Sequence, residues 1–193
     1  MNAGAAVASG DALVFLHADV EISPAAWSAL QTALTDPTVI GGAFRRRFDS
    51  PSWILAIGSL LADVRGTWLH VYLGDQAIFA RRGVFLAAGG YASSLLFEDL
   101  EFSRRLARLG RTVLIGEPVL ASSRRFVAEG NGMRLFKNLC LTMAYALGIK
   151  PDHLARYYYP EARGSSVPGG APPAASPGGE GAGTSAPIKG QRT

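Results

Sequence analysis

The chain has 193 residues, of which 48% are hydrophobic, with a formal net charge of +4 and a single cysteine. One cysteine excludes a disulfide within the chain, and the arginines occur in short separate clusters rather than on one basic face, so we expect no nucleic-acid partner. Residues 1–163 are long enough for one domain with a core, whereas residues 164–193, with eight glycines and five prolines, are expected to form a disordered tail.

Helices and strands alternate along the folded part of the chain. In chain order, the pattern predicts a helix over residues 3–9, a strand over 12–16, a helix over 24–35, a strand over 39–48, a helix over 53–64, a strand over 76–80, a helical turn over 84–88, a helix over 98–109, strands over 112–115 and 122–126, and helices over 133–147 and 151–159. This alternation favours an α/β fold with a largely parallel or mixed sheet.

The first elements carry specific signals. Asn2 is expected to cap the first helix, and the all-apolar strand Ala12–Leu16 is expected to be buried on both faces. Ser23 is a typical cap for the next helix, whose apolar stripe contains Trp27 and Leu30.

The helix over residues 133–147 is strongly apolar and contains Cys140, which we expect to be buried as a small hydrophobe. Such helices commonly pack against their own domain. The alternative is an interfacial helix at a membrane surface, because Arg134 and Lys137 lie near its start.

Asp19 lies just beyond the carboxyl end of the strand over residues 12–16. Ligands bind beyond the carboxyl ends of strands in open α/β sheets, and a carboxylate there suits a hard divalent cation that holds phosphate oxygens. His17 is either a second ligand or a hydrogen-bond donor. Alternatively, Asp19 caps the turn before the next helix, and its position alone leaves both interpretations open.

The segment FEDLEFSRRLARLG, residues 97–110, contains three acids at the start of a helix. Acids at a helix start and arginines toward its end suit the helix dipole, which is a sufficient explanation. On a helical wheel, however, Asp99 falls nearer the buried face than Glu98, and Glu101 points away. An acid directed at the body of the domain suits a general base.

Two shorter segments give weaker signals. YLGDQAIFARR places Asp75 and Gln76 just before a strand, and SSRRF places Arg124 and Arg125 beside Phe126. Arginine pairs are usually solvated surface residues, so neither segment predicts a site alone.

As an ordered set, these segments resemble family 2 glycosyltransferases with the GT-A fold, over roughly residues 1–159. MNAGAAVASGDALVFLHADV is similar to the segment that ends in the Asp-X-Asp metal motif of that family, and FEDLEFSRRLARLG is similar to its Glu-Asp segment. HAD, GDQ and SSRRF most resemble a bacterial subgroup of transferases associated with radical-SAM or selenium-linked gene neighbourhoods. The implied fold is a partial GT-A, Rossmann-like mixed sheet flanked by helices.

The resemblance implies an inverting transfer of a sugar from a nucleotide-sugar donor to an acceptor hydroxyl that the sequence does not identify. Asp19, with His17 beside it, would hold a divalent metal, Mn or Mg, that bridges the donor diphosphate. Asp99 would be the catalytic base, with Glu98 as its competitor. The implied substrate contacts are Asn2, Gly4, Asp75, Gln76, Arg124 and Arg125.

Two departures from the family pattern matter. His17 replaces the first aspartate of the metal motif, and the chain starts beyond the N-terminal half that holds the nucleotide base and ribose in the family. We therefore expect a truncated catalytic domain that self-associates through the exposed edge of Ala12–Leu16. The alternative is a non-catalytic fragment that binds a partner or a membrane surface. The first residues do not resemble a signal peptide, so we expect a cytoplasmic protein, free or peripheral at the inner membrane face.

Overall fold

The computed structural model describes residues 1–93, 96–149 and 153–154. The elements are α1 (Asn2–Val7), β1 (Ala12–Phe15), β2 (Val20–Glu21), α2 (Pro24–Thr35), β3 (Val39–Phe48), α3 (Trp53–Leu69), the 3₁₀ helix η1 (Gly74–Gln76), β4 (Ile78–Arg81), α4 (Arg82–Ala87), α5 (Glu98–Leu109), β5 (Arg111–Ala121), α6 (Arg124–Glu129) and α7 (Asn131–Ala146). The expected tail over residues 164–193 lies outside the described residues, as does all of the helix expected over 151–159 except His153 and Leu154.

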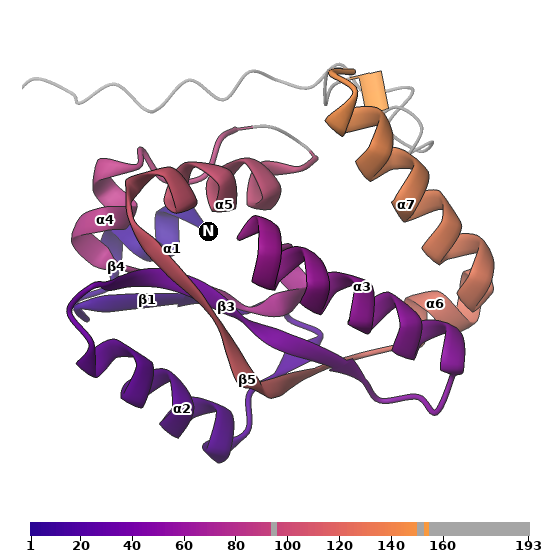
Figure 1. The fold of residues 1–193 in the computed structure, drawn as a ribbon, viewed down its shortest axis with the longest axis horizontal. Coiled ribbons are helices and arrows are strands. Elements are labelled where there is room, and N and C mark those ends of the chain that lie inside the picture. The colour runs from indigo at the N-terminus through magenta and orange to yellow at the C-terminus, as the bar shows by residue number, and fades with distance from the viewer. Residues whose placement is uncertain (94–95, 150–152, 155–193) are drawn as a thin grey trace, which may run out of the picture.

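The described strands form one sheet in the spatial order β1-β4-β3-β5-β2. The central pair β3–β5 is parallel, and the other three pairs are antiparallel. Helix α2 lies on one side of this curled sheet, and α3 and α5 lie on the other (Figure 1). The prediction of an α/β fold with a mixed sheet flanked by helices is confirmed.

Each face of the sheet has its own apolar core. One core joins the aromatic rings of Phe15, Phe85 and Phe102 beneath α5. The other contains Leu30 of α2 and Phe44 and Phe79 from the sheet. Because neighbouring strand residues point to opposite faces, the central strands β3 and β4 both contribute to the two cores.

Several local predictions hold. β3 and α5 have the predicted bounds. Ser23 caps α2, since its hydroxyl accepts a hydrogen bond from the backbone N–H of Ala26 at 3.1 Å.

Other local predictions are wrong. Leu13 and Phe15 are buried while Ala12 and Val14 are only half-buried, so β1 buries one face rather than two. Trp27 is 47% exposed because Ala26 and Leu30 fill the core side of α2 instead.

Three further expectations also fail. Asn2 lies inside α1 and gives no cap bond, because its side chain is engaged with the backbone of Tyr91. Cys140 of α7 is exposed rather than buried. The strand expected at residues 122–126 is helix α6, which starts after Ser123.

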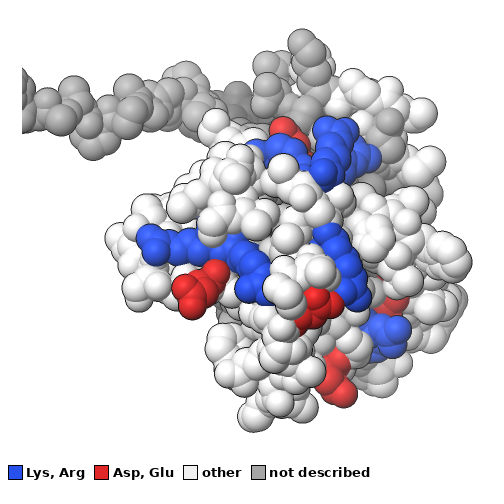
Figure 2. All heavy atoms as spheres, turned by 60° about the vertical axis from the view of Figure 1, so that its left-hand side comes forward, with Lys and Arg blue, Asp and Glu red and all other residues white. Residues whose placement is uncertain are grey.

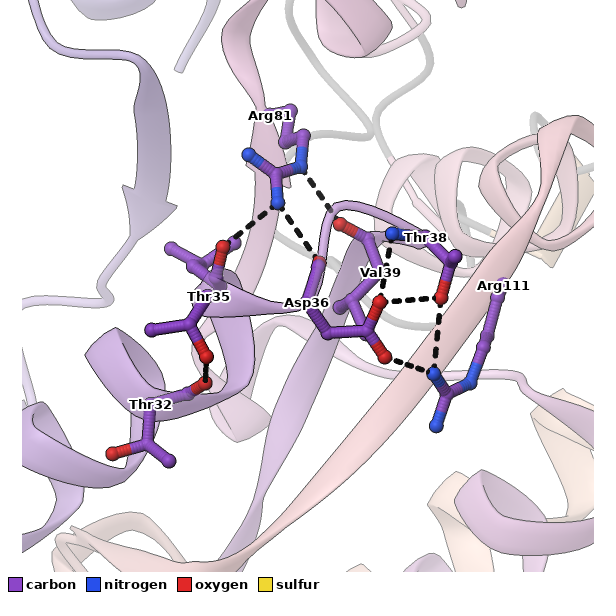
Figure 3. A network of polar contacts seen from close by, with 8 residues as sticks. Thr32, Thr35, Asp36, Thr38, Val39, Arg81 and Arg111 are labelled. Carbon is purple, nitrogen blue, oxygen red and sulfur yellow. Dashed lines mark hydrogen bonds and ion pairs between the residues drawn. The ribbon is translucent and has the colours of Figure 1, made fainter.

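The turn that joins α2 to β3 is held by two arginines from neighbouring strands (Figure 3). Arg81 donates to the carbonyl oxygens of Val39, Leu34 and Asp36 at 2.8, 2.9 and 3.0 Å. Arg111 pairs with the Asp36 carboxylate and donates to the Thr38 hydroxyl at 3.0 Å. These contacts satisfy carbonyls at the helix end, where the helix itself supplies no donors, so both arginines serve the fold.

Charges of both signs are interspersed on the surface. On the face shown in Figure 2, Lys and Arg side chains form separate groups, and acidic side chains lie beside them. In contrast, α3 leaves large apolar side chains exposed, with Trp53 70% and Trp68 78% accessible. Within the described residues, no helix is both long and apolar enough to cross a membrane.

Candidate active site

A cavity of about 260 Å³ opens where the turn after β1, η1, the start of α5, the end of β5, α6 and α7 meet. It collects six of the ten residues singled out in the sequence. These are His17, Asp19, Asp75, Glu98, Asp99 and Arg125. They come from four separate segments of the chain, so the fold, rather than sequence proximity, creates this cluster.

The start of α5 has an unusual backbone. Phe97 precedes the helix in the left-handed region, with φ of 64°, where residues other than glycine are uncommon. Its ring stacks on Tyr145 of α7, with centroids 4.8 Å apart. Backbone strain of this kind persists only where surrounding contacts enforce it. Here it starts the helix so that both Glu98 and Asp99 line the cavity.

Asp99 is held by backbone donors on both carboxylate oxygens. The N–H of Gly74 donates to Oδ2 at 2.6 Å, and the N–H of Leu100 donates to Oδ1 at 2.7 Å. Burial raises the pKa of Asp99 to about 6, and the nearby charges of Glu98 and Asp75 act in the same direction, while the two backbone donors oppose the shift. A carboxylate with a pKa near neutrality is suited to proton transfer.

We expect this pKa to appear in the pH dependence of any reaction that uses Asp99 as a base. Only the deprotonated carboxylate accepts a proton, so the rate should rise about tenfold per pH unit below a pKa of about 6 and level off above it. The measurement is kcat against pH. A rate that does not change between pH 5 and 7 would contradict this assignment.

Gly74 leaves room for the His17 imidazole as it is placed here. A Cβ atom on Gly74 would lie 2.2 Å from Nε2 of His17, which is far inside contact distance. The imidazole therefore sits directly against the backbone of η1. The same glycine donates its N–H to Asp99, so one residue positions side chains from both the β1 turn and α5.

Asp19 faces a basic side chain across the cavity. Its carboxylate lies 3.9 Å from Nε of Arg125, and its side chain is 27% exposed. The backbone carbonyl of Asp19 accepts a hydrogen bond from the N–H of Ser122 at 2.9 Å, which fixes the turn after β1 against the end of β5. The carboxylate itself remains directed at the cavity rather than capping the turn.

Asp75 has a different environment. Its Oδ2 forms an ion pair with the buried guanidinium of Arg46. Its Oδ1 is buried and has no hydrogen-bond partner within the described part of the chain. A buried acceptor without a donor is costly, so this oxygen is a candidate contact for a ligand.

The other four predicted residues do not line this cavity. The amide of Gln76 is fully buried, where it accepts from Arg65 at 3.0 Å and from the N–H of Leu73 at 3.2 Å. Asn2 bonds both backbone groups of Tyr91. Gly4 lies on the exposed side of α1, and the exposed Arg124 donates to the Ser122 hydroxyl at 3.2 Å.

Sequence reasoning missed two contributors to the site. In the sequence, Gly74 is only the residue before Asp75 and Gln76, and its close contact with His17 depends on the fold. Helix α7 forms one wall through Asn138, Leu141 and Thr142. The polar residues on one side of this apolar helix were the available signal.

The fold and the cavity together indicate a general class of protein. A sheet covered by helices on both faces, with carboxylates gathered beyond a strand end, is typical of α/β domains that bind and transform small ligands. A family model described as glycosyl transferase family 2 matches residues 1–100, more than half of the chain, and the match ends just after Asp99. The chain belongs to this family. Searches of curated proteins and of solved structures gave no match.

Proposed function

We propose that the chain is an inverting glycosyltransferase, which moves a sugar from a nucleotide-diphosphate donor to an acceptor hydroxyl with the help of a divalent metal. The main support is one cavity in which Asp99, with a pKa raised to about 6, lies together with Asp19 and Arg125. Family membership supports the sugar transfer itself. The donor, the metal and the stereochemistry are parts of the proposal.

Asp99 is the base in this proposal. Its carboxylate takes the proton of the acceptor hydroxyl while the acceptor oxygen attacks the anomeric carbon of the sugar. The bond between that carbon and the diphosphate oxygen breaks, and the diphosphate leaves with the electron pair. Attack from the face opposite the leaving group inverts the anomeric centre. The N–H groups of Gly74 and Leu100 orient the carboxylate for this step.

The leaving diphosphate needs positive charge, and Arg125 is positioned to supply part of it. No group of three or more His, Cys, Asp or Glu side chains that could hold a metal ion occurs in the described residues. Asp19 and His17 would therefore have to share a metal with substrate phosphates, which is a common mode for Mg²⁺. When bound, such a metal would neutralise charge on the diphosphate.

Asp19→Asn should weaken manganese-dependent binding of uridine diphosphate by at least about tenfold, because the Asp19 carboxylate would hold the metal that neutralises the diphosphate. His17→Ala should weaken this binding less, since the imidazole need not be a direct metal ligand. The measurement is isothermal titration calorimetry with and without manganese. Asp11→Asn is the matched control, because Asp11 is exposed and lies outside the cavity. Equal manganese stimulation in Asp19→Asn and wild type would contradict a metal role for Asp19.

A further inference from the structure

A second cavity, of about 320 Å³, lies between α3 and α7. Its walls are mainly apolar. The apolar side chains from the two helices are Leu55, Leu61, Ala62, Leu135, Phe136 and Leu139. Nothing in the proposed transfer step uses this space.

The second cavity is continuous with the candidate active site. Six residues line both cavities, namely Phe48, Leu73, Asp75, Phe126, Asn138 and Thr142. A ligand bound at Asp99 can therefore extend past these shared residues into the space between α3 and α7. Its outer wall leads to solvent, because Leu61, Phe136 and Leu139 are each at least half exposed.

Two buried polar atoms without hydrogen-bond partners lie where the two cavities meet. Arg46 is only 6% exposed, and it pairs with Asp75, donates to the Gly58 carbonyl at 3.2 Å and lies 4.6 Å from the centre of the Phe48 ring. Its Nε is buried and has no hydrogen-bond partner among the described residues, and neither has Oδ1 of Asp75. Buried polar atoms normally have hydrogen-bond partners. Nε of Arg46 could therefore donate to a ligand at this point, and Oδ1 of Asp75 could accept from it.

We propose that the acceptor is an amphiphile, with its hydroxyl at Asp99, polar atoms at Arg46 and Asp75, and an apolar chain between α3 and α7. This assignment rests on the proposed function, because it uses Asp99 to place the reacting hydroxyl. The donor is the poorer occupant of the second cavity. Its diphosphate requires Asp19 and Arg125, which line only the first cavity.

The test compares octyl β-glucoside with methyl β-glucoside, two probes with the same head group and different tails. Calorimetry with the full chain, below the micelle concentration, should show octyl glucoside binding at least about tenfold tighter, with a negative heat capacity change. Leu139→Asp should remove most of this gain. Leu147→Asp is the matched control, because Leu147 is exposed and lines neither cavity. Both sites are on the surface, so both variants should keep the melting temperature of the wild type.

Three outcomes would overturn the proposal. They are equal binding of the two glucosides, equal effects of Leu139→Asp and Leu147→Asp, and displacement of octyl glucoside by uridine diphosphate, which would assign the cavity to the donor. Failure of the proposed function looks different. In that case uridine diphosphate and manganese do not bind, whatever octyl glucoside does. If they bind while octyl glucoside does not, the transferase assignment stands and only the amphiphilic acceptor fails.

Discussion

Asp99→Asn should lower turnover by about 10²–10⁴-fold, the usual contribution of a general base. Asparagine has nearly the same shape and can still accept from the N–H of Gly74, but it cannot take the acceptor proton. Binding of uridine diphosphate with manganese should stay unchanged, because the interaction lost belongs to the transition state. The measurement is release of nucleoside diphosphate from a panel of nucleotide sugars, with water as the acceptor.

Two neighbours in the same helical turn serve as controls. Glu98→Gln also changes a cavity carboxylate and should lose less turnover than Asp99→Asn. Glu101→Gln changes an acid that does not line the cavity and should retain normal turnover. If Glu98→Gln were the more damaging variant, Glu98 would be the base and the assignment of Asp99 would be wrong.

The same variant has a distinct signature in stability. Because the pKa of Asp99 rises from 3.8 to about 6 on folding, the folded state holds this proton more tightly than the unfolded state. The contribution of this proton to folding stability is fully present below pH 3.8 and is lost as the pH rises through about 6. Above that pH, Asp99→Asn removes a buried charge but leaves only one oxygen to accept from the N–H groups of Gly74 and Leu100, so the net change in stability should be small. A clear loss of stability at pH 7 would indicate that the carboxylate serves the helix start rather than chemistry.

Gly42→Ala should produce the largest loss of stability. Gly42 pairs with Phe79 of β4 on one side and Val113 of β5 on the other, at the centre of the sheet. A Cβ atom there would lie 1.9 Å from the carbonyl oxygen of Val113, and backbone cannot rotate away as a side chain can. We expect a cost on the order of 3 kcal/mol or more, which lowers the melting temperature by roughly 10 °C.

Gly83→Ala is the matched control for this substitution. Gly83 lies in α4, and a Cβ atom on it would have no neighbour within 4 Å. Alanine is the better helix former, so this variant should be neutral or more stable by up to about 1 kcal/mol. Thermal unfolding followed by circular dichroism measures both variants. A melting temperature of Gly42→Ala within about 2 °C of the control would show that the sheet relaxes around the added methyl group.

The sequence predicts best where one local signal and the tertiary fold agree. β3 and α5 have their predicted bounds because an apolar run and an amphipathic period are each bounded by turn residues. Asp19 and Asp99 were selected from the ends of such elements, and the fold brings both to one cavity. Their positions at element ends are what made them recognisable.

Prediction fails where pairing overrides local signals. The expected strand stops at Ile115 because Gly116 and Pro118 are turn residues, yet β5 continues to Ala121. The register explains this continuation. Ile115 pairs with Phe44 and Val119 with Arg46, so three residues of β5 face one residue of β3 in a bulge that tolerates proline.

Burial is the other property that local sequence does not show. Gln76 has the residue type of a ligand contact, but its amide is enclosed and bonds Arg65, Leu73 and Phe44 instead. The apolar cavity beside the candidate active site is likewise formed by α3 and α7, whose patterns indicate only that both helices are apolar. Its continuity with Asp99 follows from the packing of helices distant in sequence.

The central claim is that one cavity holds the donor diphosphate at Asp19 and the reacting hydroxyl at Asp99. The most direct measurement is the anomalous signal of manganese in crystals of the chain grown with uridine diphosphate. We expect a manganese ion within about 2.5 Å of an Asp19 carboxylate oxygen, with the diphosphate beside Arg125 and its outer phosphate facing Asp99. Uridine diphosphate bound away from both carboxylates, or a manganese ion elsewhere on the chain, would contradict the claim.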